Sequence, residues 1–143
     1  MITLHCLEDN TLATHITILI GINDIAIIKN TGLNPEDAFL NFQNNYETLI
    51  KDIRTKSDCP ITLMEPFIFP WPQEFITWYP DVEKISSIVQ NIANKYHLQF
   101  VPTWKELLSL GVSVTTDGVH LSPNGHLMLA NLWLNVVDFS LAL

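Results

Sequence analysis

Short apolar runs alternate with long amphipathic segments along this chain, and this alternation constrains its fold more than any other feature. The clearest run covers residues 15–20, is rich in β-branched side chains, and ends at Gly21. Similar runs cover residues 60–65 and 98–101. Short, nearly unbroken apolar runs of this kind predict strands that are buried on both faces, as in a parallel sheet.

Helix signals separate these runs. Asn34 and Pro35 have the residue types of an N-cap and a first helical position, and apolar side chains then recur at three- and four-residue steps until about Lys56. Further helices are predicted from Asp81, around residues 104–110, and after Ser122 and Pro123; a short helix over 3–13 and a loop over 25–33 are also expected. The order predicts a single α/β domain over residues 1–143, a three-layer sandwich with a parallel sheet and helices on both faces.

Composition narrows the range of partners and compartments. The chain has 15 acidic and 7 basic residues, a net charge of -8, which argues against a nucleic-acid partner and an anionic membrane surface. Its amino end lacks the features of a signal peptide, and its two cysteines, Cys6 and Cys59, lie far apart in no metal-type spacing. We expect buried free thiols and a cytoplasmic protein, with a disulfide between the two cysteines as the alternative. With 48% hydrophobic and 15% charged residues, the surface is expected to have apolar parts that something else covers.

The most apolar stretch is the carboxyl-terminal one, residues 127–143. Asn131, Asn135 and Asp138 interrupt it, so it falls short of a membrane-spanning helix. We therefore predict a helix that is packed on nearly all sides.

Residues 115–126 carry the strongest candidate for chemistry. Asp117 precedes His120 by three residues on a turn-forming segment, directly before the helix start at Ser122. A carboxylate placed there can hold the tautomer of the imidazole and stabilise the imidazolium, as a general base in acyl transfer requires. By itself the spacing is more typical of an aspartate that caps local amides beside a surface histidine.

Asn23 is the second candidate, because it follows the first predicted strand at the edge where parallel sheets bind ligands. Its amide is suited to hold a developing oxyanion, whereas the simpler interpretation is a turn formed by Asn23 and Asp24. His126 rivals His120 as the base, but His120 has the nearby carboxylate. A metal site formed by Asp117, His120 and His126 matches no helix-borne zinc signature, and no metal or other cofactor is expected.

A proline-rich aromatic loop follows the second predicted strand, at residues 66–72. Its three prolines, Pro66, Pro70 and Pro72, resist both helix and sheet, so the loop is expected to be rigid. Its aromatic side chains are Phe67, Phe69 and Trp71, which either form the wall of a substrate pocket or simply pack against the core.

Taken together, the Gly21 to Asp24 block, the strand at 61–65 with its loop, and the block at 117–126 resemble the SGNH hydrolases, also called GDSL lipases and esterases, over about residues 7–137. The resemblance implies a flavodoxin-like fold, an oxyanion hole with Asn23 and Gly21, and Asp117 and His120 as the orienting acid and the base. It also implies hydrolysis of a small-molecule ester without a cofactor.

The family's nucleophile is the serine of a Gly-Asp-Ser motif on its first strand, and no such motif occurs in this sequence. We therefore expect a member that is shortened at its amino end, lacks the first strands, and is inactive alone. A non-catalytic binding module and an assembly completed by another chain remain as alternatives. Loss of the first strand would expose the edge of the strand at 16–20, so a homodimer through that strand is also predicted.

Overall fold

The structure is a computed structural model, and it describes residues 13–138. The helix predicted over residues 3–13 falls almost entirely outside this range, as does Cys6. Within it, Cys59 is a free thiol.

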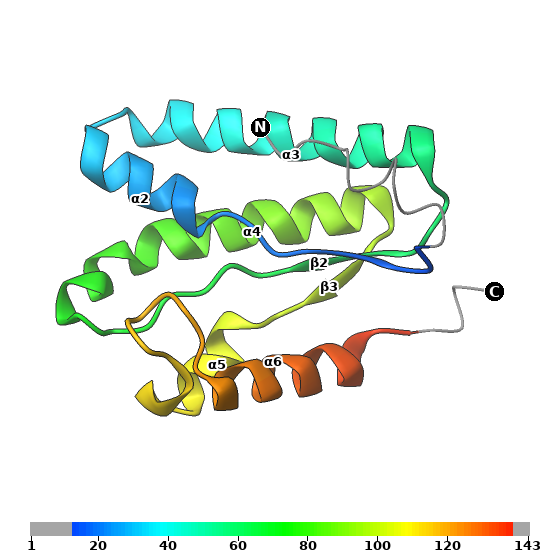
Figure 1. The fold of residues 1–143 in the computed structure, drawn as a ribbon. Helices are drawn as coiled ribbons and strands as arrows, with labels where there is room; N and C mark the ends of the chain where they lie inside the picture. Colours follow the sequence, from blue (N-terminus) through cyan, green and yellow to red (C-terminus); the bar gives the residue numbers. More distant parts are fainter. Residues whose placement is uncertain (1–12, 139–143) are drawn as a thin grey trace.

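The centre of the domain is a parallel three-stranded sheet (Figure 1). Its strands are β1 (Ile16–Ile18), β2 (Ile61–Met64) and β3 (Gln99–Val101), which lie in the order of the chain. In the register of the sheet Ile18 lies opposite Leu63, and Leu63 opposite Phe100. These strands confirm the three predicted apolar runs, and every residue of β2 is buried, as expected of a central parallel strand.

Helices cover both faces of this sheet, which confirms the predicted three-layer α/β arrangement (Figure 1). One layer contains α2 (Ile22–Thr31), α3 (Pro35–Lys56) and α4 (Tyr79–Tyr96), and the other contains α5 (Trp104–Ser109) and α6 (Pro123–Val136). Two short 3-10 helices lie in the connections: η1 (Gln73–Trp78) between β2 and α4, and η2 (Val112–Val114) between α5 and α6.

Two predicted helix starts, those of α3 and α6, are confirmed by capping hydrogen bonds, whereas the helix predicted from Asp81 begins two residues earlier, at Tyr79. The Asn34 side chain accepts a hydrogen bond from the N–H of Glu36 at 2.9 Å, and Pro35 is the first residue of α3. The hydroxyl of Ser122 accepts the N–H of Gly125 at 3.1 Å, with Pro123 first in α6. Both caps supply an acceptor to an otherwise unpaired amide, and this explains why the boundaries could be read locally.

The segment that follows β1 was predicted wrongly. Residues 25–33 were expected to form a loop, but Ile22–Thr31 is the helix α2. The helix forms because Ile25 and Ile28 bury their side chains in the core shared with α3 and α4. Tertiary burial here outweighs the turn-forming character of the polar residues around it.

The prediction that α6 is packed on nearly all sides was also wrong. Within the described part of the chain, Leu127 and Leu134 are 57% and 56% exposed, and Val136 is 43% exposed. One side of the helix packs on β3 and η2, while the opposite side faces outward. Among residues 13–138, no helix has the length and apolar character needed to cross a bilayer.

Candidate active site

The loop that carries Asp117 and His120 joins η2 to α6, on the side of the sheet where the strands end (Figure 1). A single antiparallel bridge between Thr115 and Leu121 closes its base. The N–H of Ser122 donates to the carbonyl of Val114 at 2.9 Å, so the loop leaves and re-enters the body of the domain at one point. The carboxyl end of a parallel sheet is where ligands bind in this class of fold.

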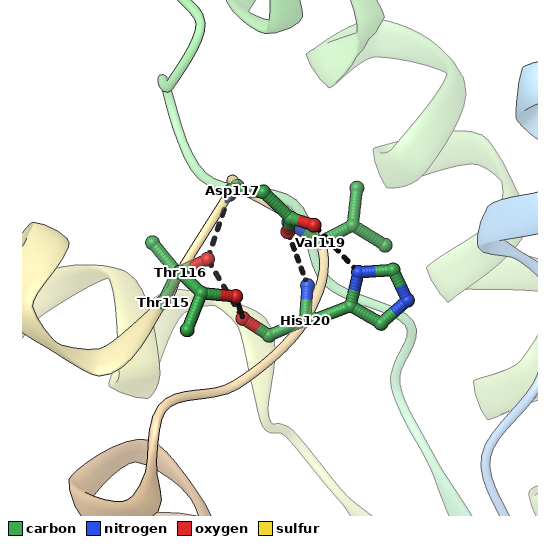
Figure 2. Close-up of polar contacts among 6 residues, drawn as sticks. Thr115, Thr116, Asp117, Val119 and His120 are labelled. Atoms are coloured by element: carbon green, nitrogen blue, oxygen red, sulfur yellow. Dashed lines mark hydrogen bonds and ion pairs between the residues drawn. The ribbon is translucent and has the colours of Figure 1, made fainter.

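Asp117 and His120 form the pair that the sequence predicted (Figure 2). Nδ1 of His120 lies 2.7 Å from Oδ2 of Asp117. The other carboxylate oxygen accepts the N–H groups of Val119 at 2.9 Å and His120 at 2.8 Å. Asp117 therefore does both things that the sequence left open, since it caps local amides and also holds the imidazole.

These hydrogen bonds set the ionisation of Asp117. The N–H of His120, the His120 ring and the N–H of Val119 lower the pKa of the Asp117 carboxyl from 3.8 to about 2. The carboxylate therefore stays charged throughout the neutral range. The side chains of His120 and Asp117 are 78% and 53% exposed, so the imidazole is open to solvent on its remaining nitrogen, Nε2.

Two threonines that were not predicted hold the other side of the loop. The hydroxyls of Thr115 and Thr116 donate to the carbonyl of His120 at 3.0 and 3.2 Å, and the N–H of Thr116 donates to the same oxygen at 2.9 Å (Figure 2). The Thr-Thr pair directly before Asp117 is the signal that could have indicated this, because short hydroxyl side chains commonly bond nearby backbone in turns.

The tip of the loop docks on the segment after β2. The N–H of Phe69 donates to the carbonyl of Gly118 at 2.9 Å. Gly118 has a φ of 91°, and a Cβ built there would lie 1.8 Å from the carbonyl oxygen of Trp71. Only glycine permits this backbone conformation together with so close an approach, so residue 118 fixes how the Asp117 and His120 loop sits on its neighbour.

The predicted oxyanion residues lie at the turn between β1 and α2. This turn is at the carboxyl end of the strands, the same end of the sheet as the His120 loop (Figure 1). Gly21 is buried, with a φ of 128° that lets the chain turn directly from strand to helix. Asn23 is exposed in the first turn of α2. Burial raises the pKa of the neighbouring Asp24 carboxyl.

A pocket of about 750 Å³ adjoins this turn and extends along α3. Its lining includes Gly21, Asn23 and Asp24 together with Phe42 and Tyr46 of α3. Neither Asp117 nor His120 lines it. The structure thus gathers the oxyanion candidates in one hollow and leaves the acid and base pair on a separate exposed loop.

Of the three predicted pocket aromatics, the structure places two in the core. Phe69 is fully buried and Phe67 is 8% exposed, so a bound substrate would not reach either ring. Their burial favours the alternative of a loop that packs against the core over the expected substrate wall. Trp71, at 62% exposed, remains available to a ligand.

The rival base and the metal alternative can also be placed. His126 is exposed on the first turn of α6, where its N–H donates to the carbonyl of Ser122. Among residues 13–138, no three His, Cys, Asp or Glu side chains gather into a group that could hold a metal ion. Asp117, His120 and His126 therefore form no metal centre in this structure.

Comparison with known proteins relates this arrangement to ester hydrolases. A sequence profile of the GDSL-like Lipase/Acylhydrolase family matches residues 7–128. No curated protein matches the sequence.

Several solved structures share the fold. A protein described as a GDSL-like lipase from Parabacteroides merdae is 23% identical, with a TM-score of 0.73, and the match covers 93% of this chain and 67% of that one. An acetylxylan esterase from Geobacillus stearothermophilus is 19% identical with a TM-score of 0.71, covering 96% of this chain and 69% of that one. An alpha/beta hydrolase enzyme from the metagenome of Lake Arreo, Spain, is 16% identical with a TM-score of 0.70, covering 92% and 65%. The chain therefore spans about two thirds of the length of the structures that it matches.

Proposed function

The chain belongs to the GDSL-like lipase/acylhydrolase family, and from that membership we propose that Asp117 and His120 are the acid and base of a site that hydrolyses small acyl esters. The observation that carries this proposal is the 2.7 Å contact between Nδ1 of His120 and the Asp117 carboxylate on an exposed loop. This arrangement is the orienting half of a Ser-His-Asp mechanism.

The contact assigns separate roles to the two ring nitrogens. With Nδ1 held by Asp117, Nε2 of His120 is the nitrogen that takes the proton from a serine hydroxyl as the hydroxyl attacks the acyl carbonyl. The same nitrogen returns the proton to the leaving alcohol. In the second half of the reaction it takes a proton from water, which attacks the acyl-enzyme and releases the acid. The pKa of Asp117 is about 2, so the carboxylate stays charged and stabilises the imidazolium at each step.

The amide of Asn23 and the N–H of Gly21 are proposed to bind the oxyanion. Both come from the turn between β1 and α2, which lies on the same side of the sheet as the His120 loop. Donors fixed in advance at the point where negative charge develops stabilise the transition state by roughly 3–4 kcal/mol each. Exposed Trp71 is the remaining aromatic candidate for contact with the acyl or alcohol group.

The serine is the part that these residues do not supply. No Gly-Asp-Ser motif occurs in the 143 residues, and we propose that they are inactive as an esterase on their own. For the Geobacillus stearothermophilus esterase, variants with serine or aspartate replaced by alanine are described as catalytic mutants. In subtilisin, loss of the nucleophilic serine lowers kcat about 10⁶-fold.

A second candidate function, that of a partner-binding module, is favoured by the open edge of the sheet. Within the described residues β1 pairs with β2 alone, and Leu19 just beyond it is 36% exposed. An unpaired strand edge is a template for another strand. We propose that β1 pairs with a second copy of this chain, or with a chain that completes the site.

The experiment is an assay of the 143-residue chain with p-nitrophenyl acetate and with a fluorophosphonate probe, beside the His120→Ala variant. We expect equal, background hydrolysis by both proteins and no covalent adduct by mass spectrometry. Hydrolysis that disappears in the variant, together with an adduct on a serine, would show that the chain has its own nucleophile. Retention of hydrolysis in His120→Ala, with loss in His126→Ala, would show that the base is assigned to the wrong histidine.

A further inference from the structure

We propose that buried Glu65 and Trp104, which lie outside the predicted site, are positioning residues that hold the Asp117 and His120 loop in place. They do so through the segment after β2, on which the loop docks. The catalytic meaning of this inference rests on the proposed function, whereas the mechanical link itself does not.

Glu65 is the first step of this link. It directly follows β2, its side chain is 8% exposed, and its N–H donates to the carbonyl of Val101 at 3.1 Å. Oε2 of Glu65 accepts the N–H of Trp104, the first residue of α5, at 2.8 Å, and the Thr103 hydroxyl donates to the Glu65 carbonyl. The side-chain oxygen thereby satisfies a backbone N–H in the first turn of α5, which has no partner within that helix.

Trp104 is the second step. Its side chain is 2% exposed, and its indole Nε1 donates to the carbonyl of Ile68 at 2.7 Å. The Tyr79 ring packs edge-on against it, with the ring centres 4.9 Å apart. Because the indole is fixed from several sides, Ile68 cannot shift without the loss of a buried hydrogen bond.

The third step joins this anchor to the loop. Phe69, the residue after Ile68, donates its N–H to the carbonyl of Gly118, and the carbonyl of Trp71 lies against the α-carbon side of Gly118. Gly118 in turn follows Asp117, and its own N–H donates to the Thr115 hydroxyl at 2.7 Å. A displacement of residues 68–71 would therefore move the backbone between Asp117 and His120.

The network explains why a carboxylate lies at the buried end of β2. Catalytic groups must be held to within about half an ångström of their working geometry, and loops do this only when neighbouring contacts restrain them. The Asp117 and His120 side chains are exposed, so packing around the side chains themselves does not restrain them. The buried contacts of Glu65 and Trp104 instead restrain the segment on which the loop docks.

The test compares Glu65→Ala, Glu65→Gln and Trp104→Phe in the full chain. Amide exchange at Phe69 reports the docking contact, and an NMR titration of the Asp117 carboxyl reports the geometry of its hydrogen bonds. For Glu65→Ala we expect at least tenfold faster exchange at Phe69 and a rise of the Asp117 pKa from about 2 toward 3.8. Glu65→Gln keeps an acceptor for the Trp104 N–H, so the exchange rate at Phe69 and the pKa of Asp117 should stay close to those of the unsubstituted protein.

The control is Ile53→Ala, a cavity-forming change in the last turns of α3. It lowers stability without touching the network, so the Asp117 titration should stay at its original midpoint. If Glu65→Ala matches this control in both measurements, the proposal is wrong.

Trp104→Phe keeps most of the ring volume but removes the hydrogen-bond donor to the Ile68 carbonyl. It therefore tests the same link if Glu65→Ala does not fold. Unchanged exchange at Phe69 and an unchanged Asp117 titration in that variant would also overturn the proposal. Neither readout needs a substrate, so failure of the link and failure of the proposed esterase function are separate outcomes.

Discussion

The carboxylate of Asp117 contacts His120 twice, through the ring Nδ1 at 2.7 Å and through the backbone N–H at 2.8 Å. The backbone contact holds the conformation of the loop. The side-chain contact occupies Nδ1 of the ring and leaves Nε2 as the nitrogen that can accept a proton. One aspartate thereby shapes the loop and sets the tautomer of the proposed base.

This double contact predicts an unusual acid titration. The Asp117 carboxyl should titrate near pH 2, because His120 and Val119 hydrogen bonds favour its charged form. Since the folded-state pKa lies below the ordinary value of 3.8, the carboxylate stabilises the loop fully above about pH 4 and loses this effect as pH falls through 2. A carbon-13 NMR titration measures the midpoint.

The matched variant for this titration is His120→Ala. It removes the ring contact but keeps both backbone N–H donors, so the midpoint should rise only part of the way to 3.8. A midpoint near 3.8 in the unmodified protein would mean that the carboxylate does not make these contacts in solution.

A second prediction concerns the docking of Gly118. Gly118→Ala would place Cβ against the Trp71 carbonyl and force a side chain onto a φ of 91°, so we expect a loss of about 3–5 kcal/mol in the free energy of unfolding. Gly111→Ala is the control, because φ there is 82° but nothing lies within 4 Å of the added Cβ. It should cost about 1 kcal/mol. Urea denaturation measures both, and equal losses would show that the loop does not dock on Trp71.

A third prediction concerns self-association of the chain through β1. We expect the isolated chain to self-associate through the open edge of β1, with an apparent mass that rises with concentration in analytical ultracentrifugation. Leu19→Lys, which places a charge beside that edge, should shift the protein toward monomer.

The exposed side of α6 supplies the control for this experiment. The double change Leu127→Gln and Leu134→Gln removes apolar surface from the outward side of α6 and leaves the residues of β1 unchanged, so it should leave the association intact. If this variant is monomeric while Leu19→Lys still associates, the contact surface is α6 and the edge proposal is wrong.

The features that the sequence predicted well are those with a local physical cause. The caps at Asn34 and Ser122 mark helix starts because their side chains bond amides two or three residues away. The strands were recognisable because a buried parallel strand needs apolar residues on both faces. The contact of Asp117 with His120 spans only three residues, so its spacing contained the geometry.

The features that the sequence missed depend on tertiary contacts. Helix α2 forms because Ile25 and Ile28 find a core to pack on, and the three-residue spacing of Ile22, Ile25 and Ile28 is too short a pattern to identify a helix by itself. Three prolines indicated a rigid loop at 66–72, but could not show that Phe67 and Phe69 point inward while Trp71 points out. The roles proposed for Glu65 and Trp104 join segments that lie 39 residues apart in the chain.

A fourth prediction applies to a completed domain, made by fusing to this chain a family segment that carries Gly-Asp-Ser. In that protein Asp117→Asn should lower kcat for p-nitrophenyl acetate about 10⁴-fold, since an amide does not hold the productive tautomer of His120. Asp81→Asn is the control, because Asp81 pairs with Lys29 between α4 and α2 and is not part of the proposed site. This substitution should leave kcat within about twofold. A loss of less than tenfold in Asp117→Asn would mean that Asp117 only caps its loop.

The role of His120 as the base is tested most directly by the rate of p-nitrophenyl acetate hydrolysis by this completed domain and by its His120→Ala variant. We expect hydrolysis that requires the added serine and falls at least 10³-fold in His120→Ala, while circular dichroism shows both proteins folded. A folded fusion in which His120→Ala hydrolyses the ester as fast as its parent would contradict the assignment of His120 as the base.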